Sequence, residues 1–103
     1  MTPDYSRLLD AALGASIRVE FDTDRRAVTN YSVVLVVDEG AGPQTVRVYD
    51  GTHGVNEMHR YTRAGGKQPA EIFDAGTLGE GMRAAMRQVE TSYEAMIASW
   101  RQS

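Results

Sequence analysis

The sequence predicts a two-layer α+β fold, in which a mainly antiparallel sheet of four or five strands packs against a short N-terminal helix and a long C-terminal helix. Two patterns support this prediction. Between residues 16 and 63, segments are rich in β-branched residues or alternate between apolar and polar ones, whereas apolar residues recur every three or four positions from residue 82 to 100. With 103 residues the chain has room for one hydrophobic core, so we expect a single α+β domain over residues 1–103.

Residues 2–13 predict the short N-terminal helix. Thr2 suits the N-cap, Pro3 suits the first helical position, and Gly14 suits the exit from the helix. The apolar residues of this segment recur at helical spacing along one side: Tyr5, Leu8, Leu9, Ala12 and Leu13.

Residues 16–22 predict the first strand. The apolar residues Ile17, Val19 and Phe21 alternate with charged ones, as expected for a strand with one face in water. A turn at residues 24–26 follows it.

Residues 30–37 predict the central strand, because apolar side chains occur on both of its faces. Val34 and Val36 alternate with four further apolar residues: Tyr31, Val33, Leu35 and Val37. A β-branched run of this kind needs cover on both sides and is an aggregation hazard if it is left exposed. We expect the N-terminal helix or a second copy of the chain to cover the face that the long helix leaves open.

The remaining strands are predicted at residues 45–49 and 57–63, with a short edge strand at residues 70–73. A hairpin loop at residues 39–43 precedes the first of these, since it carries two glycines and a proline. The turn-rich residues 50–56 connect the first to the second.

The clearest element is the C-terminal helix. Thr77 and Glu80 have the capping-box spacing, in which each side chain bonds a free backbone amide at the helix start. The apolar stripe that follows predicts burial of Met86, Val89 and Tyr93 against the sheet.

Composition limits the classes of function. The formal net charge of -3 argues against a general binder of nucleic acids or anionic membranes. Residues 44–68 nevertheless carry a local charge of +2, from three arginines and Lys67 against Asp50 and Glu57. The chain has no cysteine and no long apolar segment, so we expect a cytoplasmic protein with no membrane partner and no cofactor.

Both histidines fall in this locally basic stretch. Asp50, His53 and His59 occur where one strand of a hairpin ends and the next begins, so their side chains can gather at one end of the hairpin. Two imidazoles and a carboxylate suit an open divalent-metal site or acid/base cleavage of a phosphodiester. An alternative interpretation is structural, with Asp50-Gly51 as a turn-forming pair and His59 as a half-exposed strand residue.

A resemblance covers residues 44–101. The run Arg47-Val48-Tyr49-Asp50-x-x-His53-Gly54, then His59, then a break at Gly65-Gly66-Lys67 and a helix ending near Trp100, resembles short bacterial proteins with a Tyr-Asp-x-x-His hairpin. Some of those proteins are similar to TumE-type toxins of toxin-antitoxin pairs, so the resemblance implies a toxin-like activity.

Two hypotheses follow for function. In the first, the chain is a non-enzymatic interaction module that forms a homodimer or binds another protein through the free face of its sheet. In the second, it is a small toxin-like or nuclease-like enzyme that acts on RNA or another phosphodiester through His53 and His59 with Asp50. The second hypothesis assigns phosphate contacts to three arginines: Arg47, Arg60 and Arg63.

Overall fold

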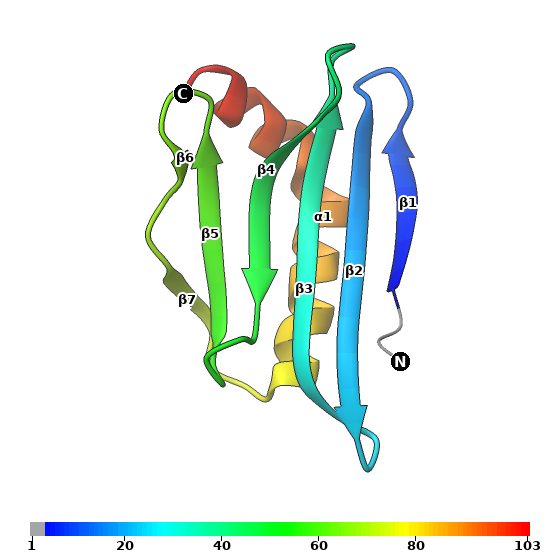
Figure 1. The fold of residues 1–103 in the computed structure, drawn as a ribbon, viewed down its shortest axis with the longest axis vertical. Helices are drawn as coiled ribbons and strands as arrows, with labels where there is room; N and C mark the ends of the chain where they lie inside the picture. Colours follow the sequence, from blue (N-terminus) through cyan, green and yellow to red (C-terminus); the bar gives the residue numbers. More distant parts are fainter. Residues whose placement is uncertain (1–3) are drawn as a thin grey trace.

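The computed structural model describes residues 4–103 as one antiparallel sheet with one helix on one of its faces (Figure 1). The sheet order is β1-β2-β3-β4-β5-β6, and β7 also pairs with β5. The strands are β1 (Asp4–Asp10), β2 (Ala15–Asp24), β3 (Ala27–Asp38), β4 (Pro43–Asp50), β5 (Asn56–Thr62), β6 (Gly66–Lys67) and β7 (Glu71–Asp74), and the helix is α1 (Leu78–Arg101). The α+β class and the antiparallel sheet are confirmed, whereas the described residues form seven strands rather than four or five.

The predicted N-terminal helix is wrong, because residues 4–10 form the edge strand β1. This strand pairs with β2 from Asp4 opposite Glu20 to Asp10 opposite Ala15. The pairing satisfies backbone groups along the edge of β2 that a helix would leave open. The proposed N-terminal capping residues, Thr2 and Pro3, lie outside the described residues.

The long central strand β3 fixes the geometry of the sheet. It pairs with β2 from Ala15 opposite Val37 to Asp24 opposite Ala27. Arg25 and Arg26 form the tight turn between these strands, both with positive φ. The two strands extend beyond the predicted ranges, since their pairing continues to the turn, with one β-bulge between Asp22 and Thr23. The additional strand β6 has only two residues, too few for any periodic signal.

The core lies between the sheet and α1. Ile17, Val19, Val33 and Leu35 contribute side chains that are at most 1% exposed. The helix begins as predicted, because the Glu80 amide donates to Thr77 Oγ1 and the Thr77 amide donates to Glu80 Oε1.

The buried side of α1 is largely as predicted. Val89 is fully buried in the core. Met86 and Tyr93 are half-buried instead, because they lie toward the edge strand: Met86 Sδ accepts from the Tyr5 hydroxyl, and the Tyr93 hydroxyl donates to Asp10.

The other side of the sheet, which we call the open face, is turned toward the viewer in Figure 1 with α1 behind it. No helix or strand among residues 4–103 lies over this face. Val34 and Val36 of the central strand belong to it, since they alternate with the core residues of β3. Helices that could cross a lipid bilayer are also absent from residues 4–103.

Candidate functional site

The hairpin formed by β4 and β5 carries the predicted histidine site. Asp50 is the last residue of β4 and lies opposite Glu57, while His59 lies opposite Val48. Directly opposed residues share a face, and these four residues alternate with the core pair Tyr49 and Met58. Asp50, Glu57 and His59 therefore all belong to the open face.

The two histidines pair with different carboxylates. His53, in the connection between the strands, places Nδ1 2.6 Å from Glu57 Oε1. His59 places Nε2 3.8 Å from Asp50 Oδ2. The His53 side chain is 72% exposed and that of His59 is 12% exposed, so the two imidazoles have very different access to solvent.

The tautomer of neutral His59 follows from its second contact. Its Nδ1 lies 3.0 Å from the carbonyl oxygen of Gln68, which can only accept a hydrogen bond. Nδ1 therefore carries a proton, and Nε2 is the atom left to accept or release one beside Asp50.

Asp50 also has a structural task in the turn. Its Oδ1 accepts from the Thr52 amide, the bond expected of an aspartate that initiates a turn. The two readings of Asp50 are compatible, because Oδ1 serves the turn and Oδ2 is turned toward His59.

No group of three or more acidic or histidine side chains in residues 4–103 is arranged to hold a metal ion. His53 lies beside Glu57 and His59 lies beside Asp50, so each imidazole contacts one carboxylate rather than sharing a common site.

The arginines assigned to phosphate lie elsewhere. Arg47 and Arg60 oppose each other in β4 and β5, and they line a cavity together with Met96 and Trp100 of α1. They are thus on the helix side of the sheet. His59 and Arg60 are consecutive in a strand and point to opposite faces. The structure therefore does not bring these two arginines together with the histidines.

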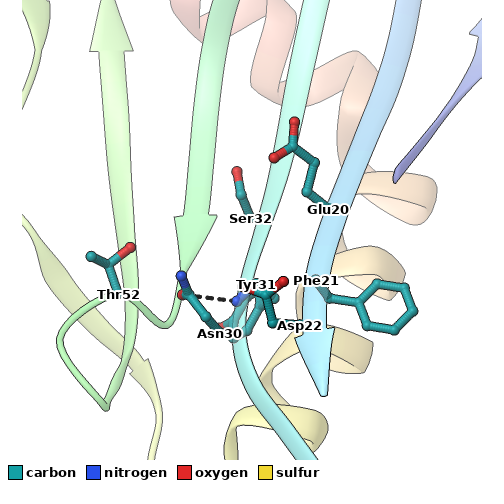
Figure 2. Close-up of a pocket in the computed structure, with 7 residues that line it drawn as sticks. All are labelled: Glu20, Phe21, Asp22, Asn30, Tyr31, Ser32 and Thr52. Atoms are coloured by element: carbon teal, nitrogen blue, oxygen red, sulfur yellow. Dashed lines mark hydrogen bonds between the residues drawn. The ribbon is translucent and has the colours of Figure 1, made fainter. Parts of the chain in front are cut away.

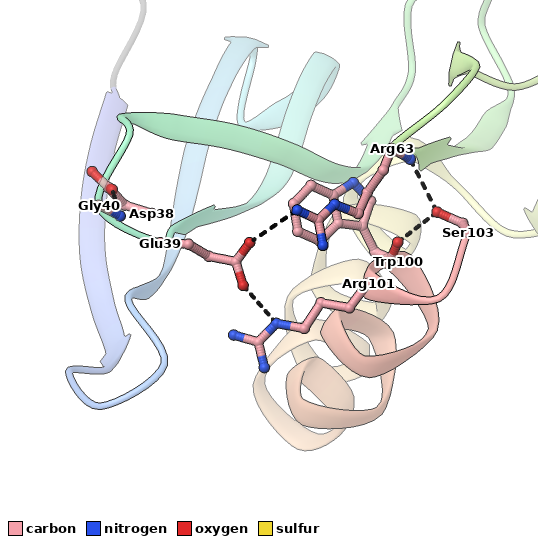
Figure 3. A network of polar contacts seen from close by, with 7 residues as sticks. All are labelled: Asp38, Glu39, Gly40, Arg63, Trp100, Arg101 and Ser103. Carbon is pink, nitrogen blue, oxygen red and sulfur yellow. Dashed lines mark hydrogen bonds and ion pairs between the residues drawn. The ribbon is translucent and has the colours of Figure 1, made fainter.

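Arg63 has structural contacts near the C-terminal end of α1 (Figure 3). Its guanidinium lies 4.9 Å from the centre of the Trp100 ring and its Nη2 lies 3.8 Å from Glu39 Oε1. Arg101 donates to the other oxygen of Glu39 at 2.7 Å. The Arg63 amide also donates to Ser103 Oγ, so this network ties the residue after β5 and the loop after β3 to the end of the helix.

A shallow pocket of about 80 Å³ includes further residues of the open face that sequence reasoning missed. Figure 2 shows Glu20 and Ser32 beside each other on β2 and β3, with Thr52 across from them in the loop after β4. The pocket is far smaller than an ordinary ligand site. The sequence signal that could have identified these residues is the alternation of charged and apolar residues in β2, which places its charged side chains on the open face.

Asn56 and Tyr31 form a buried polar contact below this pocket. The Tyr31 hydroxyl donates to Asn56 Oδ1 at 2.9 Å. Burial raises the pKa of Tyr31 well above its ordinary value, and the nearby carboxylates Asp50 and Asp74 raise it further. Sequence reasoning did not identify this pair, because Asn56 occurs among turn-forming residues.

Comparisons of the chain with protein-family models, with curated proteins and with solved structures give no match.

Proposed function

We propose that the chain is a non-enzymatic interaction module that forms a homodimer through the open face of its sheet. The observation that carries this proposal is an apolar patch at the centre of that face, without cover from any element of residues 4–103. Val34 and Val48 are directly opposed in β3 and β4, and Val36 is the next open-face residue along β3. Val34 and Val48 are half-buried and Val36 is 5% exposed, and the side chains that surround them come from the sheet itself. An apolar sheet centre on which no other layer packs favours association.

The charges around this patch support a second copy as the partner. One row across the sheet is acidic, with Glu20, Asp50 and Glu57. The next row places Arg18 on one side of the valine pair and His59 on the other. A two-fold axis that runs between these two rows and parallel to them would set the acidic row of one copy against the Arg18 row of its partner, which is the self-complementarity that a symmetric dimer requires.

The test is the mass in solution, measured by light scattering at micromolar concentration. We expect twice the mass of the chain for the parent protein and the mass of one chain for Val34→Lys, because dimerisation would bury a charged and bulky side chain in a closely packed apolar contact. Ala98→Lys adds the same charge on the exposed side of α1 and should leave the dimer intact.

Circular dichroism should show that both variants keep the fold, since neither residue belongs to the core. A parent protein with the mass of one chain would refute the proposal. So would a Val34→Lys variant that is folded and remains dimeric.

A second candidate function is a toxin-like enzyme that cleaves RNA, with His53 and His59 as the acid/base pair and Asp50 orienting His59. The specific observation in its favour is that both imidazoles and both carboxylate partners belong to one hairpin end, with His59 Nε2 free to exchange a proton. The double change His53→Ala plus His59→Ala should then abolish RNA cleavage and growth arrest while the fold is retained. Equal cleavage by the parent and the double variant would exclude the enzyme.

A further inference from the structure

Two positive charges oppose each other on the helix side of the sheet. Arg47 of β4 and Arg60 of β5 are direct cross-strand neighbours, and like charges in such positions repel. Arg60 is partly compensated, because its Nε lies 3.3 Å from Glu71 Oε2 in an exposed ion pair. Arg47 forms no ion pair with any carboxylate of residues 4–103. A further anion at this position would remove the repulsion.

The Arg47 side chain also carries an unused donor. Its Nε is buried and has no hydrogen-bond partner among the described residues. A buried N–H without an acceptor costs free energy, and the cost is larger when the donor is charged. The position of this donor indicates where an acceptor would bind.

Space for an acceptor exists beside the Arg47 side chain, and a turn of the guanidinium toward this space would expose the Nε to it. Arg47 lines a groove of about 390 Å³ between β4 and α1, whose helix wall offers the hydroxyls of Ser92 and Ser99 together with Met96. A neighbouring cavity of about 190 Å³ shares Arg47, Met96 and Ser99 and adds Arg60. The larger groove is within the size range of small-molecule sites, and its wall is partly apolar.

We propose that this groove binds the phosphate group of a small phosphorylated molecule. A guanidinium is always charged and offers parallel donors that match two phosphate oxygens, so the Nε of Arg47 and a terminal nitrogen can bind together. Arg60 supplies a second positive charge and the serines supply neutral donors. The apolar wall contacts the remainder of the ligand.

This site is separate from the open face. The histidines are on the opposite side of the sheet, so a phosphate held by Arg47 is bound without being cleaved by them. A dimer formed through the open face would leave the groove accessible.

The test uses the full chain and inorganic phosphate as the probe, at an ionic strength held constant with sodium chloride. We expect phosphate to shift the Arg47 Nε–H resonance in NMR spectra and to raise the thermal midpoint, since an anion that binds only the folded state stabilises it. Arg47→Met should weaken phosphate binding by at least about tenfold. Because this change also removes the buried unpartnered donor, stability without phosphate should be unchanged or higher.

Arg83→Met is the matched control, because it removes an exposed arginine that lines neither cavity and should leave phosphate affinity unchanged. Arg60→Gln, at an exposed position, tests the same site should Arg47→Met fail to fold, and it should also weaken binding. An Arg47 resonance that stays in place during the titration would overturn the proposal, as would equal losses of affinity in Arg83→Met and the groove variants. A response to acetate as large as that to phosphate would overturn the assignment to phosphate.

Discussion

The buried side chain of Asn56 connects several elements of the fold. It is 1% exposed, and its Nδ2 lies within hydrogen-bond distance of three backbone carbonyl oxygens, those of Asp74, Gly76 and Thr77. Its Oδ1 accepts from the Tyr31 hydroxyl. One amide therefore holds the end of β7 and the start of α1 against β3. Gly81 faces it, since any Cβ at that position would collide with the Asn56 amide.

The Tyr31 hydroxyl in this cluster makes stability depend on pH. Its pKa is raised in the folded state, so above the unfolded value of about 10 the unfolded chain loses a proton that the native chain keeps. The stabilisation is fully present below that pH and is lost as the pH rises, with a slope of up to about 1.4 kcal/mol per pH unit. Urea unfolding between neutral and strongly alkaline pH measures this slope.

Tyr31→Phe should reduce the alkaline loss, because it removes the titrating group. The comparison must be made as a difference between variant and parent, since the pKa of Tyr93 is also raised, by burial and by its bond to Asp10. Identical alkaline slopes in both proteins would contradict the assignment to Tyr31.

At the residue scale, the histidine site was predictable in part. The positions of Asp50, His53 and His59 at one hairpin end follow from the turn-rich sequence between two strands. The partner of each imidazole could not be predicted in this way, because it depends on side-chain rotamers and on the path of residues 66–74. The separation of His59 from Arg60 could have been predicted from the alternation of side chains along a strand.

At the scale of elements, the N-terminal segment shows where periodicity misleads. Tyr5, Leu8 and Leu9 fit a helical stripe, but a helix of about 12 residues is marginal on its own and needs tertiary packing. As a strand, the same segment forms a ladder of backbone hydrogen bonds with β2. It also contacts α1, because Arg7 Nη2 donates to Glu90 Oε1 at 2.7 Å. Pairing with the edge of β2 stabilises the strand more than the helical spacing stabilises a short helix. No local sequence pattern reveals that this edge is available. By contrast, α1 was predictable because its capping box and its long apolar stripe both indicate a helix over the same residues.

The β1–β2 hairpin requires a glycine at position 14, and this requirement can be tested. This residue has φ +72, and a Cβ there would collide with the Asp38 carbonyl oxygen. Its own carbonyl accepts from the Asp38 amide at 2.9 Å, so the hairpin end is held tightly against β3. Gly14→Ala should therefore destabilise the protein by about 2 kcal/mol or more, from backbone strain plus the collision.

Gly54→Ala is the matched control for this prediction. Gly54 has a similar φ of +80, but no atom lies within 4 Å of the position of its Cβ. The change there should cost only the backbone strain of about 1–2 kcal/mol. Equal losses of unfolding free energy in the two variants, measured by urea unfolding, would show that the contact with Asp38 carries no cost.

At the scale of the whole molecule, the sheet has one covered and one open face. The covered face depends on α1, which contacts β3, β4, β5 and β7. The sequence predicts this face well, because the helix stripe and the strand alternation both indicate it. It predicts the open face less well, since the N-terminal segment that was expected to cover it extends the sheet instead. As a result, no second layer packs on the central valines Val34 and Val48, which are half-buried.

The dependence of the core on one helix leads to a prediction about global stability. Val89 is 0% exposed and packs in the core at the middle of α1, so Val89→Asp would place a carboxylate there without a partner. The expected cost of about 4–5 kcal/mol is close to the whole stability of many small proteins, and we expect loss of cooperative thermal unfolding. Ala98→Asp introduces the same residue on the exposed side of α1 and should melt like the parent. A Val89→Asp protein whose thermal midpoint stays within about 4 °C of the parent would show that this side of the helix does not face the core.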